Sequence, residues 1–525
     1  MTTAESTASR STPPRFTARL RTLWGAGSGP LVARLFQCLL ALIFLDAWIS
    51  LGVQIRVLLG QRGLLPVAPL FEAVRAQKNI GFGELPSLLW WWTSDAALFA
   101  HVGAGIVLAL LALFNLRPRL CFLLSTALYL SIAVAARTFL SFQWDNLLLE
   151  CGLLAALLPT DRPAPLRHLL FRLLLFKLYF ESGLAKWYSP LHDWQDGSAM
   201  TYYYETAPLP TALAWYAHHA PISWHHVESW ATLALELGVP FLLFGPRLAR
   251  RVAFVVFTGF QIVNAATANY GFFCHLALAL HVFLLDDEDL RRVRHWWAVR
   301  RGWSLPGARA SLPAASPDLG RARWRVRLSR GLSVLALIVY GGISLVEGYA
   351  QFSRAGGKDQ GEHTWLDRLD PVRARYQPLR LVNNYHLFAA ITRERIEPEF
   401  QTRTGDAGAE WVAHHLHHKP GDPLRRPDWV APHQPRVDFQ LWFHGLSFRR
   451  NTPAYVATLV DRLCHDPAAV AELFTAPLPP APTAVRIAYW QYHFTTADER
   501  QKSGAWWNRE LFATIRPIEC HPTKE

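Results

Sequence analysis

The stretch DWQDGSAMTYYYETAPLPTALAWYAHHAP, Asp193 to Pro221, lies between two long apolar segments. It is too polar to cross a bilayer, which requires about 20 mostly apolar residues. It is also too aromatic for an ordinary solvated loop, and Trp and Tyr are the residues that favour the boundary between lipid and water. We therefore expect residues 187–224 to form a structured loop that covers the outer end of a bundle of membrane helices, with a short surface helix in LPTALAWYAHHAP.

The composition is that of an integral membrane protein. Of the 525 residues, 51% are hydrophobic and only 18% are charged, and the apolar residues are grouped in blocks close to twenty. These blocks exclude an ordinary soluble enzyme and predict about nine transmembrane helices. The predicted helices are 31–51, 97–114, 119–140, 146–158, 166–186, 226–244, 248–263, 271–285 and 328–348.

The formal charge of +13 reflects membrane topology rather than nucleic-acid binding. Arginine collects in short stretches beside apolar segments, as in RLARR at 247–251, and such residues usually mark cytoplasmic connections. With the N-terminus inside, residues 1–30 are predicted to be a disordered cytoplasmic tail. The membrane domain then covers 31–350, and the loop at 187–224 lies outside.

The character of the chain changes after residue 351. Strand-like runs, VDFQLWF at 437–443 and VRIAYWQYHF at 485–494, alternate with turn signals such as KPGDP. We predict a β-rich extracytoplasmic domain over 351–525. Cys464 and Cys520 both lie in it, either as free thiols or as a disulfide if this part is outside.

Charged residues occur inside the predicted fifth helix. Arg172, Lys177, Glu181 and Lys186 lie within it or at its end, and charges in a bilayer usually face a partner or a wet cavity. Lys177 and Glu181 are spaced i, i+4, so we expect them to pair on one face. A structural ion pair and a ligand-binding or catalytic cavity are both open interpretations.

Two more acids, Asp145 and Glu150, lie at the outer end of the predicted fourth helix. Five residues apart, they do not share a helical stripe and make a poor acid–base pair. We expect them to be structural partners of Arg137 or Arg172.

Histidines cluster at 218–219, 225–226 and 414–418, without a spacing such as HExxH that would favour zinc. We predict no metal site and no cofactor, and we interpret HHLHH at 414–418 as a polar surface strand.

DGSAMTYYYETAPLPTALAWYAHHAP resembles the signature of the lipase maturation factors, polytopic membrane proteins of the endoplasmic reticulum with bacterial relatives. The similarity continues in FQWDNLLLECGLLA, LVNNYHLFAAITRERIE and KPGDPLRRPDWVAPHQPRVDFQLWF, and covers roughly residues 34–520. The resemblance implies a role in the folding of secreted lipases. The expected partners are the lipid bilayer and a lipase or other client protein. The expected location is a bacterial cytoplasmic membrane, or the endoplasmic reticulum membrane if the source is eukaryotic.

A second, local resemblance concerns Lys186. YFESGLAK followed by DWQDGSAM, residues 179–200, is similar to part of the membrane domain of vitamin K-dependent carboxylases. The resemblance implies Lys186 as a catalytic base. For such an enzyme we expect Glu181 as the tuning partner of Lys186 and a lipid or quinone-like substrate. This enzyme is the alternative to a non-enzymatic maturation factor.

For the maturation factor we predict client contacts on the loop and on the domain above it. The predicted residues are Tyr202, Tyr203, Glu205, Trp215, His218, His219, Trp429 and His433. We also expect the C-terminal domain to dock on the loop through Trp429, with Trp442 and Trp490 filling the core of the domain itself.

Overall fold

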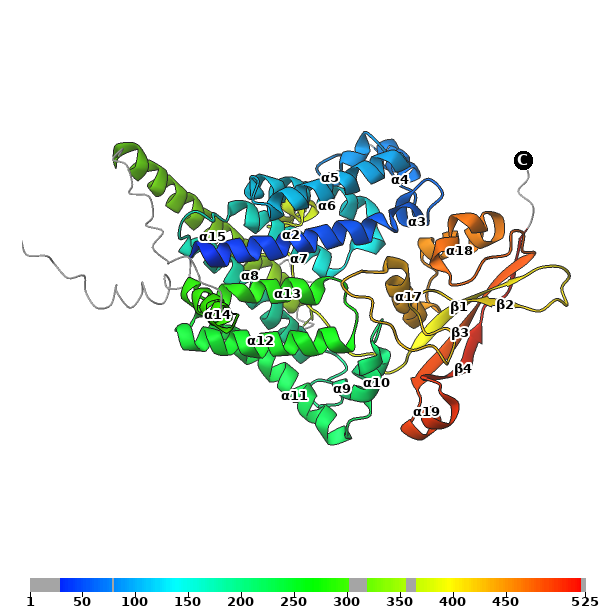
Figure 1. Cartoon of the computed structure of the whole chain (residues 1–525). Coiled ribbons are helices and arrows are strands. Elements are labelled where there is room, and N and C mark those ends of the chain that lie inside the picture. The colour runs from blue at the N-terminus through cyan, green and yellow to red at the C-terminus, as the bar shows by residue number, and fades with distance from the viewer. Residues whose placement is uncertain (1–28, 78–79, 302–318, 356–364, 521–525) are drawn as a thin grey trace, which may run out of the picture.

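The computed structural model describes residues 29–77, 80–301, 319–355 and 365–520. It contains a helical part and, at one end of that part, a C-terminal part built on an antiparallel sheet (Figure 1). The tail predicted at 1–30 lies outside the described residues except for its last two. The protein is therefore a multi-pass membrane protein with a C-terminal β domain.

Within the described residues, six helices are long and apolar enough to cross a membrane. Each corresponds to a predicted apolar block. They are α2 Pro30–Gly52, α5 Asp95–Leu113, α6 Pro118–Ala136 extended by η2 Arg137–Leu140, α11 Ile222–Gly238 extended by η3 Val239–Phe244, α12 Arg247–Thr267, and α15 Leu319–Ala355, apolar over Arg327–Phe352.

The three other predicted helices also form, but each is too short or too charged to qualify as a membrane-spanning helix by length and composition. They are α7 Gln143–Leu157, α8 Pro165–Trp187, and α13 Phe273–His281 with η4 Val282–Leu284. Nine membrane crossings therefore remain a prediction. Proline in the first turn starts α2, α6 and α8, where its missing N–H costs no hydrogen bond.

Shorter helices fill the connections. The loop at 187–224 contains α9 Ala199–Thr206 and α10 Ala212–His218, which confirms the predicted short helix. The others are α3 Ile55–Leu59, α4 Val67–Ala76, η1 Leu88–Trp90, α14 Asp287–Arg300, α16 Asp370–Tyr376 and η5 Gln377–Leu379.

The C-terminal sheet has the strand order β2-β1-β3-β4, with β5 paired to β3. The strands are β1 Ile396–Arg403, β2 Val412–His414, β3 Ala484–Phe494, β4 Trp507–Thr514 and β5 Ile518–Glu519. The helices of this part are α17 Arg436–Ser447, α18 Ala454–His465, η6 Pro467–Ala469, η7 Ala471–Leu473 and α19 Ala497–Ser503. The prediction for 485–494 is confirmed as β3. Only His414 of the histidine run belongs to a strand.

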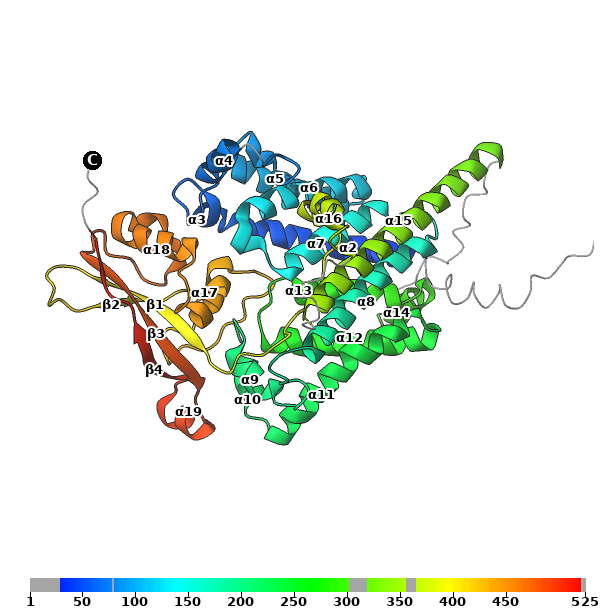
Figure 2. The ribbon, with the colours of Figure 1, turned by 180° about the vertical axis from the view of Figure 1, so that it is seen from behind.

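The strand predicted at 437–443 is wrong, because these residues form helix α17. The helix lies between the sheet and the membrane domain (Figure 2), so its polar positions are buried as well as its apolar ones. Asp438 accepts from the N–H of His418, and Gln440 donates to the carbonyl of Thr138. A Cβ on Gly445 would lie 2.0 Å from the carbonyl oxygen of Ile396, so glycine is required where α17 touches β1.

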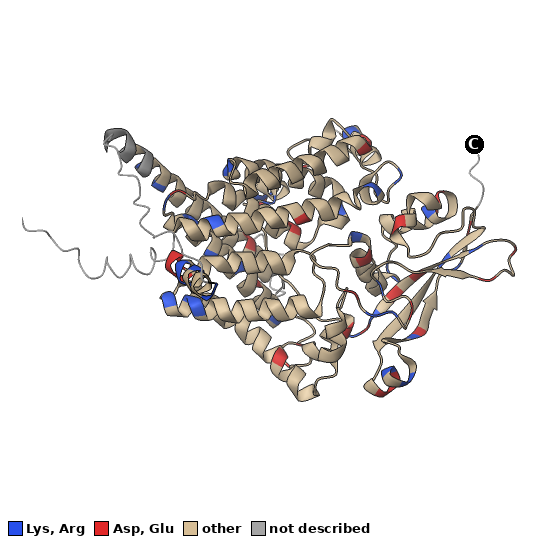
Figure 3. Ribbon diagram, viewed as in Figure 1, with Lys and Arg blue, Asp and Glu red and all other residues tan. Residues whose placement is uncertain are grey.

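The two ends of the helical part differ in charge. Lys and Arg gather at the end that carries α14 and the start of α12, and the sheet lies at the opposite end (Figure 3). Arg247, Arg250 and Arg251 pair there with Asp286 and Asp289.

Candidate functional site

The loop that follows Asp428 attaches the C-terminal domain to the membrane helices. Asn269 Oδ1 accepts from the N–H groups of Val430 and Ala431 at 2.7 and 2.9 Å, and Asn269 Nδ2 donates to the carbonyl of Asp428. WVAPHQP, residues 429–435, is irregular in structure. The Trp429 side chain, however, is 61% exposed and does not form the predicted docking contact.

His433 and the residues after it contact α2. His433 Nδ1 and Ser50 Oγ are 2.9 Å apart, and the Gln434 N–H donates to the same hydroxyl. Gly271 has a φ of +53°, and a Cβ there would lie 2.3 Å from Gln434 Oε1. The loop therefore lies directly against the membrane domain.

Arg436 completes this attachment. Its guanidinium binds both carboxylate oxygens of Asp145, at 2.6 and 2.8 Å, and donates to the carbonyl of Phe139. Tyr129 donates to Asp145 at 2.6 Å. Arg436 and Asp145 are both buried. The predicted partners of Asp145, Arg137 or Arg172, are therefore wrong.

The loop at 187–224 forms the other half of the junction. Trp215 Nε1 donates to the carbonyl of Thr495 at 2.9 Å, and Trp442 Nε1 donates to that of Thr206 at 2.8 Å. Docking of the domain on this loop is confirmed. The prediction that Trp442 fills the core of the C-terminal domain is wrong, because its helix, α17, lies at the junction. Trp490, in contrast, packs within the sheet and donates to Glu399.

Glu205 is the polar centre of this contact. It accepts from the Phe494 N–H at 2.7 Å and lies 3.0 Å from His493 Nδ1, with His218 Nε2 at 3.7 Å. Burial alone would raise the pKa of Glu205, but the hydrogen bonds from His493 and Phe494 outweigh it and lower the pKa. The hydrogen bond to Glu205 raises the pKa of His493, whereas burial lowers the pKa of His218.

The other predicted loop residues have different environments. Tyr203 is buried and bonded to Tyr270, 2.7 Å between hydroxyl oxygens. His219 Nδ1 lies 2.6 Å from the carbonyl of Trp215. Tyr202 is half-buried beneath Arg393. The histidines of the loop therefore have separate partners, and in the part of the chain that the structure describes no three His, Cys, Asp or Glu side chains converge as metal ligands would.

Residues 381–388 belong to LVNNYHLFAAITRERIE, one of the stretches that carry the family resemblance, and they enter the helix bundle, which the sequence did not predict. Tyr385 is fully buried; its hydroxyl donates to Glu150 at 2.8 Å and its N–H to Glu181 at 2.8 Å. Lys177 pairs with Glu150, Nζ to Oε1 3.3 Å. The predicted Lys177–Glu181 pair and the predicted arginine partner of Glu150 are therefore wrong. Arg172 donates to the carbonyl of Phe283.

Lys186 also has a partner that the sequence analysis missed. Its Nζ lies 2.7 Å from Glu236 Oε2 of α11 and donates to the carbonyl of Leu387 at 2.8 Å. Both side chains are buried. Glu236 is one of two acids, with Glu228, in the sixth apolar block, and an acid inside an apolar block is a signal that could have identified it.

Lys186 and Glu236 line a cavity of about 230 Å³ beneath α9. It is lined by residues of α8, α11, α12 and α13, by Trp194 and α9 of the loop at 187–224, and by residues 387–388. Besides Lys186 and Glu236, the lining includes Tyr179, Glu228, Ala231, Gly259, Gln261 and Val263.

Comparison with known proteins accounts for both parts of the chain. Residues 31–292 match the lipase maturation factor transmembrane domain, and residues 381–517 match the lipase maturation factor C-terminal domain. Lipase maturation factor 2 of Homo sapiens is 29% identical, covering 92% of this chain and 82% of the relative. Lipase maturation factor 1 of Bos taurus is 28% identical, covering 91% and 87% respectively. No solved structure matches. With both domains matched in the same order, the chain belongs to the lipase maturation factor family.

Proposed function

We propose that the protein is a membrane-embedded maturation factor that binds a secreted lipase, or another extracytoplasmic client, while it folds. The observation that carries the proposal is the similarity to lipase maturation factors over about nine-tenths of the chain. The junction described above is the second support. It holds the C-terminal domain over one end of the helices, so that both parts face the same side for a client.

The proposed client surface consists of exposed side chains along this junction. Tyr216 is 56% exposed beside buried Trp215. Arg500 lies 5.3 Å from the Tyr216 ring centre and 3.5 Å from that of Trp506. Trp429 belongs to the loop that crosses the same junction. Tyr, Trp and Arg are the side chains enriched at protein interfaces.

The predicted client residues then divide into two groups. Glu205, Trp215 and His433 position the domain, because their polar atoms are bonded across the junction. Tyr203 is buried and bonded to Tyr270 within the membrane domain, so it supports the loop at 187–224. Tyr202, His218, His219 and Trp429 retain exposed surface, and they are the ones that we propose to contact the client.

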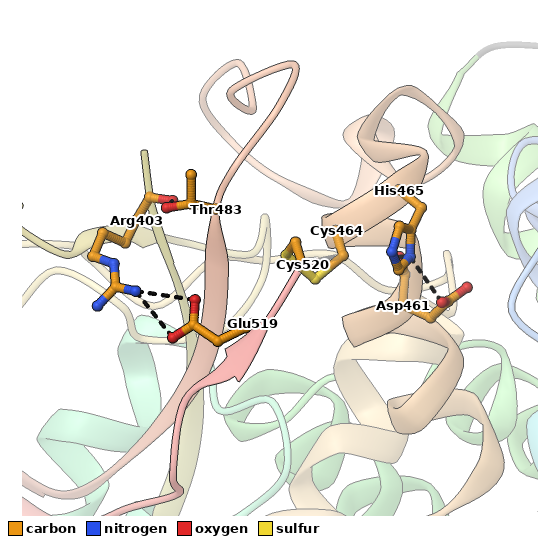
Figure 4. The surroundings of a disulfide bond; sticks show 7 residues. All are labelled: Arg403, Asp461, Cys464, His465, Thr483, Glu519 and Cys520. Carbon is orange, nitrogen blue, oxygen red and sulfur yellow. Dashed lines mark hydrogen bonds and ion pairs between the residues drawn. A yellow bond between two sulfur atoms is a disulfide. The ribbon is translucent and has the colours of Figure 1, made fainter. Parts of the chain in front are cut away.

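We propose that this end faces the extracytoplasmic side. Arginine at the opposite end supports that orientation. So does the bond between Cys464 and Cys520, because disulfides persist in oxidising compartments. Figure 4 shows it beside the Arg403–Glu519 ion pair. The membrane is then the bacterial cytoplasmic membrane or the endoplasmic reticulum membrane.

The experiment deletes the gene and measures the active fraction of a secreted lipase, then restores wild type or Trp429→Ala. Wild type should restore activity, and Trp429→Ala should restore less at equal protein level. Trp297→Ala is the matched control, because Trp297 is 49% exposed on α14 at the opposite end. Unchanged lipase activity on deletion would refute the lipase as client.

The enzyme with Lys186 as base remains a second candidate because the cavity reaches Lys186. A base must be neutral, however, and a carboxylate 2.7 Å away stabilises the charged ammonium. The candidate therefore requires the Lys186–Glu236 pair to open.

A further inference from the structure

The cavity beside Lys186 is accessible from the region between two membrane-spanning helices. Figure 1 shows α11 and α12 leaving the η3 connection together and separating toward α9 and α10. Ala231 on α11 and Gly259 and Val263 on α12 line the cavity and are also exposed. The mouth therefore lies between two helices whose outer surfaces face lipid.

The charges in the cavity disfavour an anion. Among the described lining residues, Lys186 is neutralised by Glu236, and Glu228 adds a second carboxylate. Glu228 is bonded to the Tyr204 hydroxyl and to His225. A phosphate or carboxylate headgroup would meet a surplus of negative charge, or would have to displace Glu236 from Lys186.

Gln261, in the wall of the cavity, carries a hydrogen-bond acceptor that has no partner among the described residues. Gln261 is 2% exposed, and its Nε2 donates to the Tyr179 hydroxyl at 3.0 Å. Its Oε1 is buried without a hydrogen bond to any described residue. Leaving a buried acceptor unpaired costs about 1–3 kcal/mol, so a ligand that donates a hydrogen bond would stabilise this position.

The cavity volume suits a headgroup with the start of an apolar chain. An apolar cavity of about 150 Å³ already holds a benzene-sized molecule, and this one has about 230 Å³. The rest of a long chain would lie between α11 and α12. We propose that the cavity binds the hydroxyl headgroup of a neutral lipid, which donates to Gln261 Oε1 while its acyl chain enters from the bilayer. The proposal does not rest on client binding.

The test uses the full chain in phosphatidylcholine nanodiscs and a monoacylglycerol probe that carries a photoactivatable group near its headgroup. Labelled peptides are identified by mass spectrometry. Wild type should be labelled on α11 and α12. Gly259→Leu should lower this labelling about tenfold, because a Cβ there points into open space and the larger side chain narrows the mouth.

Gly103→Leu is the matched control. Gly103 is also an exposed glycine inside a membrane helix, with no atom within 4 Å of a Cβ, but it does not line the cavity. Ala231→Leu narrows the same mouth from α11. It should lower the labelling as Gly259→Leu does, and it replaces that variant if Gly259→Leu does not fold. Gln261→Met should lower labelling about fivefold through loss of one hydrogen bond.

Two results would overturn the proposal. One is equal labelling in Gly259→Leu, Ala231→Leu and Gly103→Leu, which would mean that the probe binds elsewhere. The other is equally strong, Gly259-sensitive labelling by a fatty acid probe of the same chain length, which would refute the neutral headgroup. Lipase activity is not measured here, so failure would leave the proposed function untouched.

Discussion

Arg436 and Asp145 form a buried, two-bonded ion pair that joins α17 of the C-terminal domain to α7 of the membrane domain. Removing one partner of such a pair leaves the other charge buried and unpaired, which destabilises the folded protein by about 3–5 kcal/mol. Because the pair joins the two domains, its loss should loosen the whole junction rather than unfold one helix.

Arg436→Met or Asp145→Leu should therefore make the linkage between the domains sensitive to limited proteolysis. The double variant with both changes should be less damaged than the two single effects added together. Arg62→Ala is the control, since the Arg62–Asp466 pair joins the same domains but is exposed to solvent. Equal sensitivity of Arg436→Met and Arg62→Ala to proteolysis would contradict the claim that the Arg436–Asp145 pair holds the junction together.

The Glu205–His493 contact should make docking depend on pH. The lowered pKa of Glu205 means that its contribution is present above its ordinary value of 4.5 and is lost as pH falls through the lowered pKa. The raised pKa of His493 means that its contribution is full below 6.5 and is lost as pH rises through the raised pKa.

Crosslinking between cysteines introduced on either side of the junction should therefore be most efficient in mildly acidic solution and should decline in both directions. His493→Gln should remove the decline on the alkaline side, whereas the decline on the acidic side, which comes from Glu205, should persist. A profile that His493→Gln leaves unchanged would show that another group controls it.

Lys186→Arg separates the two candidate functions. Arginine keeps the positive charge beside Glu236 but is not deprotonated in proteins and cannot act as a base. A maturation factor should therefore retain lipase activation with Lys186→Arg. Lys186→Met should lower the level of folded protein in the membrane, because Glu236 is left unpaired. Loss of function in a folded, stably inserted Lys186→Arg variant would favour the enzyme.

The location of the C-terminal domain can be checked through its cysteines. Cys464 and Cys520 should resist alkylation in intact cells until a reductant is added, because they are bonded to each other. Alkylation of both without reductant would place the domain in a reducing compartment. Reporter fusions after Arg300 and after Gly361, the latter outside the described residues, should report cytoplasmic and extracytoplasmic locations respectively.

The sequence predicted the helices because apolar blocks of bilayer length leave few alternatives. The strand-like run VRIAYWQYHF, set between turn signals, predicts β3. The sequence does not predict α17, because the helix is buried on two sides and its apolar residues therefore do not recur with the spacing of a one-sided helix. Local spacing also suggested the wrong partner for Lys177: Glu150 lies 27 positions away. Arg436 and Asp145 are separated by 291 positions, and spacing along the chain does not encode such a contact.

The most direct test of the central claim is photocrosslinking at the proposed client surface. A photoreactive residue placed at 216 or 429 should capture a newly secreted lipase before it becomes active, and the crosslink should disappear once the lipase is folded. The same residue at 297, exposed at the opposite end, should capture none. Equal capture at 297, or no capture at 216 and 429 in a folded protein that still supports lipase activity, would contradict the account.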